Sequence, residues 1–450
     1  MKIDARCMRA IAAALFAAAT LPGATAANAA VVISKDPTQN MSCSGGICTP
    51  TGPDAVLNVS DLFFMLEDSD VTIKSTEAAL DIELAAVFGW NLERSLTLDA
   101  YRSITIKKQL TIAGLHGSLA LVTNDGGVGG DFWFDRTGHI DFWNRSARLT
   151  INGISYKLVD NIADLATAIA RKPRGSYALA NDYNAQNDGS YSHPPVNTDF
   201  PGTFEGLGHT ISNLSIWETD KFTPLAGLFV AVKRHGLVRD LRLTDANILS
   251  DIRDEEQLAG TITGENDGTI LQCSATGSVS SAYQLVGGGL AGVSDGAIIR
   301  SFADVTVEGA DGSELGGLAG SVARHVSDSY ALGHVAGGDQ SWVGGLFGYS
   351  GGRLTNVYST GSVSGGQNSV VGGLIGASGS NGAISHAYWD VTTSGTSNPV
   401  GNGNAIGITG LTTEEFLAGL PTGFAPGTWK EKSAVNAGYP YLLSNPPPKK

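Results

Sequence analysis

Charged side chains are scarce in this chain of 450 residues, where Asp, Glu, Lys and Arg together make up 16%, against roughly 25% in an average soluble domain. Within this small set, 43 acidic residues outnumber 29 basic ones, which gives a formal charge of -14. The shortage of Lys and Arg argues against a nucleic-acid partner, because phosphate binding depends on these side chains. The 42% of hydrophobic residues excludes a disordered chain, which would combine low hydrophobicity with dense charge.

Proline is also sparse, with 16 residues, whereas glycine is abundant, with 59. The glycines do not recur at every third position, so a collagen-like triple helix is excluded. Long apolar runs are lacking after the N-terminus, so we expect no integral membrane segment. The composition therefore indicates a folded, weakly charged, acidic chain that forms several domains or one extended array.

Residues 1–29 are predicted to be a secretory signal peptide. The chain starts with the basic residues Lys2, Arg6 and Arg9 and continues with an apolar stretch at 11–21. The small-residue pattern Ala-Asn-Ala that follows fits a cleavage site. We therefore expect export through the Sec route and a secreted or cell-surface location, with the periplasm as the alternative.

Cysteine is rare, with 4 residues, and one of them lies in the predicted signal. Cys43 and Cys48 lie close together in the sequence SCSGGICTP. In an oxidising compartment this spacing favours a short disulfide loop. A metal site would need more ligands than this stretch provides, because it contains no His and no third Cys.

A repeat of 28 residues organises the second half of the chain. The string GGLAG occurs twice and is followed by GGLFG and GGLIG. We expect weaker copies around Leu228 and Leu258. The glycine and leucine that define the regular copies are Gly289 and Leu290, Gly317 and Leu318, Gly345 and Leu346, and Gly373 and Leu374.

Further columns in the same register follow each glycine motif. One column aligns Cys273 with small residues such as Ser301, so we expect this cysteine to pack in the stack and not to act as a catalytic thiol. The next column is aromatic. It is predicted to form a ladder inside the core or, if it faces outward, a strip suited to sugar or protein contact. The aromatic residues of this column are Phe302, Tyr330, Tyr358 and Tyr388.

Each repeat contains about three short runs rich in Val, Ile, Leu and Tyr, separated by Gly, Ser, Asp or Asn. Such runs are typical of strands. A unit of three strands cannot bury its apolar face alone and must stack on its neighbours. The sequence therefore predicts an all-β fold, a right-handed parallel β-helix with one coil per repeat, a few short helices and a non-repeating C-terminal cap. Glycine is expected where the chain turns or where coils approach closely.

The domain organisation follows from these patterns. Short helices are predicted at 60–67, with Ser60 as N-cap, at 161–170 and at 412–420. The predicted parts are a signal peptide at 1–29, an N-terminal segment with the Cys43–Cys48 disulfide at 30–70, irregular β-helix coils at 71–225 with a helical and polar insertion near 160–205, the regular repeats at 226–393, and a C-terminal cap and tail at 394–450.

The repeats resemble a known family. The runs VGGLFGYSGGRLTNVYSTGSVSGG and GTITGENDGTILQCSATGSV are similar to the GLUG motif of bacterial surface proteins. The block around YALANDYNAQNDGSY looks like the segment that precedes such repeats in filamentous-haemagglutinin-like proteins. The resemblance implies a secreted or surface-exposed β-helix, often adhesin-like, and it supplies no catalytic residues.

We predict that the protein is not an enzyme and acts by surface binding to a host-cell, matrix or glycan surface, without nucleic acid, cofactor, metal or catalytic residues. Two matches to G-x-S-x-G, at Ser294 and Ser350, lie in repeats without a helix signal and so do not indicate a hydrolase. The alternatives are a carbohydrate-active enzyme, either a polysaccharide lyase or a hydrolase, and a purely structural envelope or matrix component. Three or more charged side chains converging in one groove would favour the enzyme. A smooth face of Tyr, Asn and Ser would favour binding.

Overall fold

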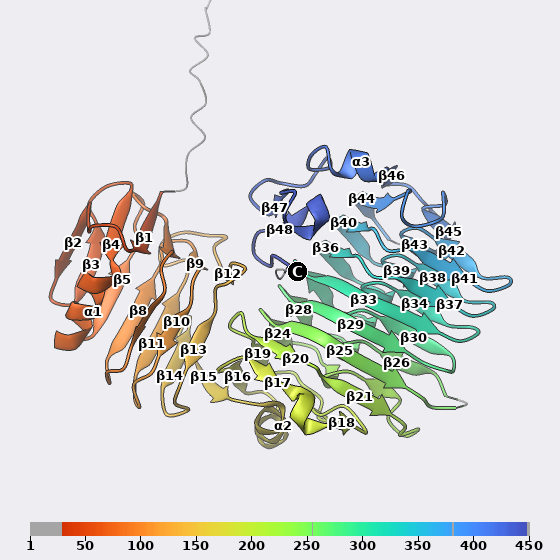
Figure 1. Ribbon diagram of the computed structural model, residues 1–450, viewed down its shortest axis with the longest axis horizontal. Coiled ribbons are helices and arrows are strands. Elements are labelled where there is room, and N and C mark those ends of the chain that lie inside the picture. The colour runs from red at the N-terminus through yellow and green to blue at the C-terminus, as the bar shows by residue number, and fades with distance from the viewer. Residues whose placement is uncertain (1–28, 254, 380–381, 448–450) are drawn as a thin grey trace, which may run out of the picture.

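The computed structural model describes residues 29–253, 255–379 and 382–447 (Figure 1). Apart from its last residue, the predicted signal peptide lies outside the described residues. The described chain is a parallel β-solenoid with short helices and a C-terminal part that leaves the stack, which confirms the predicted fold class. Figure 1 shows two stacks of coils that meet at an angle, here called the N-terminal arm (30–151) and the repeat arm (154–411). The C-terminal segment (412–447) lies against the repeat arm.

The N-terminal arm is built from three parallel ladders of short strands in which apolar and polar residues alternate. In three-residue strands such as Ile104–Ile106, the outer two side chains are buried and the middle one is partly exposed, as expected for a half-buried strand. One sheet contains β4 (Ala55–Asn58), β1 (Ala30–Ser34), β6 (Asp81–Leu84), β9 (Ile104–Ile106) and β12 (Phe132–Phe134). The others contain β7 (Phe88–Trp90), β10 (Leu110–Ile112) and β13 (Ile140–Phe142), and β5 (Val71–Lys74), β8 (Ser95–Asp99), β11 (Ser118–Val122) and β14 (Arg148–Ile151).

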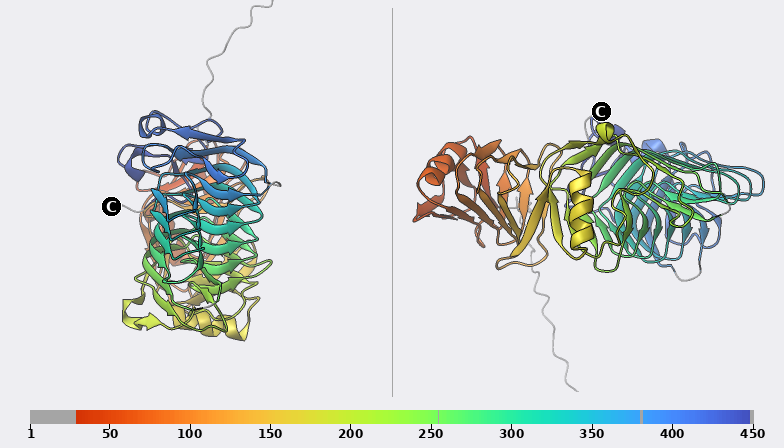
Figure 2. Two further views of the ribbon diagram at one scale, coloured as in Figure 1. Left: turned by 90° about the vertical axis from the view of Figure 1, so that its right-hand side faces the viewer. Right: turned by 90° about the horizontal axis from the view of Figure 1, so that it is seen from below.

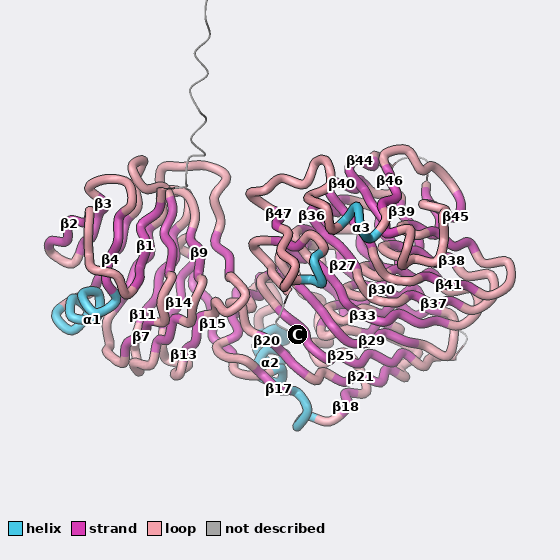
Figure 3. The backbone as a smooth tube through the Cα atoms, turned by 45° about the horizontal axis from the view of Figure 1, so that its top comes forward, coloured by secondary structure: helices cyan, strands magenta, loops and turns pink. Residues whose placement is uncertain are grey.

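The outer end of this arm is closed by helix α1 (Val59–Asp68) and by a hairpin, as Figures 1 and 3 show. The predicted N-cap is wrong, because the cap is Asn58, whose side-chain oxygen accepts from the backbone N–H of Ser60 at 2.7 Å. The hairpin pairs β2 (Met41–Ser44) with β3 (Ile47–Pro50) and carries the expected Cys43–Cys48 disulfide across it.

A tight hairpin between the arms reverses the direction of the solenoid. Strand β15 (Ile154–Val159) runs antiparallel to β14, and the next strand, β16 (Ser176–Leu179), is parallel to β15. The loop consists of Asn152 and Gly153, with φ of 48° and 78°. Two positive φ angles define the hairpin turn for which Asn-Gly is the strongest sequence signal.

The helical part of the predicted insertion near 160–205 is confirmed, whereas its polar part belongs to the coils and is not an insertion. Helix α2 (Ile162–Arg171) packs beside the junction, and the rest forms coils whose short strands pair with those of the next coil. The sequence pattern did not predict these strands, because two of them have only two residues each. They are β17 (Tyr183–Asn184), β18 (Ser190–Tyr191) and β19 (Thr203–Glu205).

The repeat arm stacks residues 28 apart directly on one another, as the coils in Figure 2 illustrate. Its strands are parallel throughout the regular part. They are β30 (Leu285–Gly288), β34 (Glu314–Gly316), β38 (Trp342–Gly344) and β42 (Val370–Gly372) in one sheet, β31 (Ala291–Ser294), β35 (Ala319–Val322), β39 (Phe347–Ser350) and β43 (Ile375–Ser378) in a second, and β33 (Phe302–Gly309), β36 (His325–Ala331), β40 (Arg353–Ser359) and β44 (Ile384–Asp390) in a third.

The Gly-Leu motif forms the corner between the first two sheets. Its leucines Leu290, Leu318, Leu346 and Leu374 are fully buried. A Cβ on Gly317 would lie 2.4 Å from the carbonyl oxygen of Gly345 in the next coil. Close approach of coils therefore explains this glycine column, with no need for a positive φ.

The register of one weak copy differs from the sequence prediction. Leu258 pairs with Val286, and Ile262 takes the motif position because its backbone N–H donates to the carbonyl of Leu290. Leu228 does lie in the motif column, since the following residues of the two coils are paired. The prediction for Leu258 was wrong because the coil that contains it is longer than 28 residues.

Candidate functional site

A cleft of about 890 Å³ lies between the N-terminal arm and the C-terminal segment. One wall is the outer face of the sheet that contains β6, β9 and β12. The other wall comes from residues 426–446, more than 280 positions later in the chain. Figure 1 shows these two parts facing each other across the open side of the angle between the arms.

The wall on the N-terminal arm carries a flat row of outward side chains. Glu83 on β6 is paired in register with Thr105 on β9, which is paired with Trp133 on β12. Trp133 lies between the buried Phe132 and Phe134. Strand alternation thus turns a partly exposed indole and two polar groups toward the cleft.

The charged residues on this wall are arranged in ion pairs between neighbouring coils. Arg102 binds Asp81 through two nitrogens, with Nε–Oδ1 at 2.8 Å and Nη2–Oδ2 at 2.5 Å. This hydrogen bonding raises the pKa of the Arg102 guanidinium. Lys107 Nζ lies 2.6 Å from a carboxylate oxygen of Glu83. The bidentate pair of Arg102 with Asp81 holds both side chains in a defined geometry.

The opposite wall is the two-stranded sheet of β47 (Trp429–Lys430) and β48 (Tyr441–Leu442) with its flanking loops. Lys430 and Lys432 are exposed there. The tail that follows is fastened at two places, by Arg136 Nε donating to the carbonyl of Pro447 at 3.0 Å and by the Asn445 side chain donating to the carbonyl of Cys273 at 2.9 Å. These contacts fix the second wall relative to both arms.

The C-terminal segment is held in place by the aromatic column. Phe302, Tyr330 and Tyr358 stack with ring centroids 4.8 Å apart. The three rings belong to an apolar cluster that is separate from the solenoid core. This cluster also contains Phe416 and Trp429 of the C-terminal segment. The column is therefore a buried ladder on the outside of the coils, covered by this segment. Phe302 at one end of the column also lines a cavity of about 630 Å³ beside the C-terminal segment.

Hydrogen bonds join the aromatic column to the C-terminal segment around this apolar cluster. The Tyr358 hydroxyl donates to the carbonyl of Pro440 at 2.6 Å, and the Tyr388 hydroxyl donates to that of Thr422 at 2.7 Å. The indole N–H of Trp429 donates to Asp328 at 3.1 Å. Burial raises the pKa of Tyr358 well above its ordinary value. Helix α3 (Thr413–Phe416) begins with a capping box at Thr412, close to the predicted start of the helix.

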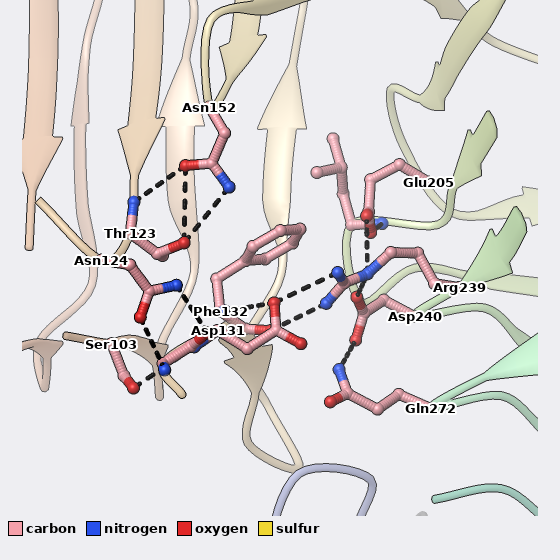
Figure 4. A network of polar contacts seen from close by, with 12 residues as sticks. Ser103, Thr123, Asn124, Asp131, Phe132, Asn152, Glu205, Arg239, Asp240 and Gln272 are labelled. Carbon is pink, nitrogen blue, oxygen red and sulfur yellow. Dashed lines mark hydrogen bonds and ion pairs between the residues drawn. The ribbon is translucent and has the colours of Figure 1, made fainter. Parts of the chain in front are cut away.

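A buried ion network joins the two arms and includes Asp131, which also lines the cleft (Figure 4). Arg239 of the repeat arm reaches across to the N-terminal arm, where its Nη1 lies 3.2 Å from Asp131 and its Nη2 donates to the carbonyl of Phe132 at 3.0 Å. The guanidinium also lies 4.0 Å from the centroid of the Phe132 ring, within the range of a cation–π contact. Its Nε lies between the carboxylates of Asp240, at 2.7 Å, and Glu205, at 3.2 Å.

One cation is shared by three carboxylates in this network. Desolvation raises the pKa of Glu205 well above its ordinary value, and the nearby charge of Asp240 adds to the shift. Desolvation also raises the pKa of Asp240. The charge of Asp240 makes Glu205 harder to ionise in this buried position, whereas Arg239 beside both groups favours their ionised forms. Asp240 is further held by Gln272, whose side-chain N–H donates to it at 2.7 Å.

The remaining candidate residues from the sequence are buried within the repeat arm. Cys273 is buried, and its backbone N–H donates to the Ser301 hydroxyl at 3.1 Å. Ser294 and Ser350 of the G-x-S-x-G matches are buried in parallel strands, not at a strand-to-helix turn. Within the described ranges, no three His, Cys, Asp or Glu side chains gather closely enough to hold a metal ion.

The sequence did not predict the cleft. Its residues lie in the irregular strands and in the non-repeating tail, where no periodic pattern marks them. The available signals were Trp133 at the outward position of the FWF strand and the Asn152-Gly153 turn, which folds the arms toward each other.

In the part of the chain that the structure covers, no helix is long and apolar enough to cross a membrane.

Comparisons with known proteins give one short sequence match and one distant structural match. No family model matches the chain, so membership of the GLUG family is not shown. Halomucin of Haloquadratum walsbyi is 33% identical over 140 residues, which cover 27% of this chain and only 1% of halomucin. A solved chain from Bacteroides ovatus, named provisionally as an immunoglobulin A1 protease, aligns with 64% of this chain and 92% of its own length, at 19% identity and a TM-score of 0.47.

Proposed function

We propose that this protein works outside the cytoplasm as an adhesin-like binding protein that attaches to a glycan-bearing cell or matrix surface through the cleft. The observation that carries the proposal is the in-register row of Glu83, Thr105 and Trp133 on one wall of a cleft whose other wall is the C-terminal segment. Sugars present apolar faces that stack on indole rings and hydroxyls that bind charged and polar groups, so this wall suits them.

Features outside the cleft support an extracellular setting. The Cys43–Cys48 disulfide is of a kind that persists in oxidising compartments. The predicted signal at residues 1–29 and the resemblance of the repeats to the GLUG motif of bacterial surface proteins favour the same location.

The state of the charged groups favours binding over catalysis. Asp81, Glu83 and Asp131 each lie within 3.2 Å of an Arg or Lys nitrogen. A carboxylate already engaged by a cation at hydrogen-bond distance is less free to contact a reacting group of a substrate. The same pairs are well suited to orient hydroxyl groups of a bound sugar.

A glycan array followed by attachment to glycan-bearing cells tests the proposal. Trp133→Ala removes the indole from the cleft and is expected to weaken glycan binding about fivefold, as loss of one stacking contact of about 1 kcal/mol would do. Trp217→Ala is the matched control, because Trp217 is 53% exposed on the repeat arm and does not line the cleft. Equal loss in both variants, or no binding to any glycan or cell, would contradict the proposal.

A carbohydrate-active enzyme is the second candidate, because charged side chains do converge in this groove. Asp135 lines the cleft, and its carboxylate accepts from the backbone N–H of Arg136. Among the described residues no ion pair of Asp135 is found, so it is the carboxylate best placed to act as an acid or base. Release of reducing ends or unsaturated uronates from polysaccharides, lost in Asp135→Asn, would establish the enzyme. Unchanged polysaccharide chains after prolonged incubation would reject it.

A further inference from the structure

We infer that the ligand of the cleft is an anionic polysaccharide, a chain of sugars that carries carboxylate or sulfate groups. This inference rests on the proposed function and specifies its ligand. The cleft is lined by seven basic residues and four acidic ones, a surplus of three positive charges, in a chain whose formal charge is -14. The basic residues are Arg102, Lys107, Lys108, Arg136, Arg300, Lys430 and Lys432, and the acidic ones are Asp81, Glu83, Asp131 and Asp135.

The positive surplus is available to a ligand because the acidic residues are mostly paired already. Asp81, Glu83 and Asp131 are engaged by Arg102, Lys107 and the buried Arg239. Four other lining cations make no ion pair with a carboxylate in the part of the chain that the structure describes. These cations are Lys108, Arg300, Lys430 and Lys432.

The positions of these cations indicate a polymer and not a small acid. Lys108 follows β9 on one wall, and Lys430 and Lys432 lie on the opposite wall. Arg300 comes from a turn of the repeat arm, just before β33. A ligand that contacts all four must carry several anionic groups spread along its length, and the volume of about 890 Å³ lies near the upper end of small-molecule sites.

The chemistry of the walls favours a polysaccharide over a nucleic acid. The row of Glu83, Thr105 and Trp133 offers one indole and two hydrogen-bonding groups, whereas single-stranded nucleic acids use several aromatic platforms. A local positive surplus would concentrate an anionic sugar chain at the cleft, more strongly at low salt.

Titration calorimetry with three polysaccharides tests this inference. Polygalacturonate supplies carboxylates, chondroitin sulfate supplies sulfates, and dextran is neutral. We expect binding to one or both acidic polymers, weakened by added salt, and at least tenfold weaker binding to dextran. The stronger of the two acidic polymers identifies the anionic group that the cleft prefers.

Variants of the cleft lysines place the site. Lys430→Gln with Lys432→Gln is expected to weaken binding of the acidic polymer about tenfold. The control is Lys157→Gln with Lys172→Gln, which makes the same change of charge at exposed lysines that do not line the cleft. Its affinity is expected to stay within about twofold of the unaltered protein.

The outcomes separate the inference from the proposed function. Dextran binding as tight as that of the acidic polymers, or equal losses in both lysine pairs, would overturn the anionic ligand and leave glycan binding intact. Failure to bind any polysaccharide or cell would reject both statements. Binding of single-stranded DNA in place of all three polysaccharides would also overturn the inference.

Discussion

Neighbouring coils of the repeat arm are joined differently from those of the N-terminal arm. In the repeat arm, glycines such as Gly317 allow carbonyl groups of the next coil to approach closely, and the stretch 344–376 holds a single charged residue, Arg353. In the N-terminal arm, ion pairs such as Arg102 with Asp81 and Lys107 with Glu83 link successive coils. The regular stretch 344–376 is thus nearly uncharged, whereas the N-terminal arm and the C-terminal segment supply most of the charged groups that line the cleft.

The largest effect is expected where the two arms meet. Arg239→Met leaves Glu205 and Asp240 without their cation in a buried site, which should lower the free energy of unfolding by about 3–5 kcal/mol. Arg353→Met changes an exposed arginine of the repeat arm and should alter it by less than about 0.5 kcal/mol. Chemical denaturation measures both. A loss below 1 kcal/mol for Arg239→Met would show that the network does not join the arms.

Substitution of two glycines distinguishes a closely packed position from one on the open surface. Gly317→Ala places a Cβ 2.4 Å from a backbone oxygen, so the coils must shift, at a cost of about 1–3 kcal/mol. Gly52→Ala in the N-terminal arm meets nothing within 4 Å and should be neutral or slightly stabilising. Thermal unfolding of the two variants checks this difference. Equal melting temperatures would mean that the glycine column is not required by packing.

Much of this fold could be predicted from the sequence, because the 28-residue spacing fixes which residues stack. The glycine and leucine columns, the small residues around Cys273 and the approximate helix positions all follow from local pattern. Facing side chains from unrelated segments could not be predicted. Trp133 and Lys430 line the same cleft only because Asn152 and Gly153 reverse the solenoid and the tail folds back.

The aromatic column shows the same limit in another way. Its periodicity was visible in the sequence, but its environment depends on Phe416, Phe424 and Trp429 of the non-repeating segment. No repeat pattern links these residues to the column. A ladder on the outside of the coils was therefore predicted either as a core or as a binding strip, and the cover provided by the tail was missed.

A buried carboxylate of the repeat arm should make stability depend on pH. Desolvation raises the pKa of Glu314 from 4.5 to about 7, and its Oε1 is buried without a hydrogen-bond partner. The folded state then binds more protons than the unfolded state, so its contribution is complete below about pH 4.5 and is lost as the pH rises through 7. Glu314→Gln should remove this loss and gain about 1–2 kcal/mol at pH 8.

Denaturation of both proteins at pH 4.5, 6 and 8 measures the effect. Glu308→Gln is a suitable control, because Glu308 is an exposed glutamate of the neighbouring strand β33. Parallel pH profiles for the unaltered protein and Glu314→Gln would contradict the assignment of a raised pKa to this group.

The smallest effect concerns the docking of the C-terminal segment on the ladder. Tyr358→Phe removes a hydroxyl that donates to Pro440 and accepts from Asn436, so it should destabilise the protein by about 0.5–1.5 kcal/mol. The hydroxyl of Tyr330 is buried with no partner among the described atoms, and Tyr330→Phe should be neutral or stabilising. Hydrogen exchange in residues 412–447 distinguishes them. Equal exchange rates in the two variants would show that the Tyr358 hydroxyl does not hold the C-terminal segment in place.

The central claim is that recognition takes place where the N-terminal arm faces the tail and not on the regular repeats. Hydrogen exchange of the full chain with and without the tightest-binding acidic polysaccharide tests it most directly. We expect the ligand to slow exchange in β6, β9, β12 and residues 426–446, with no change in β34, β38 and β42. Protection confined to the repeat strands or their turns would contradict the account.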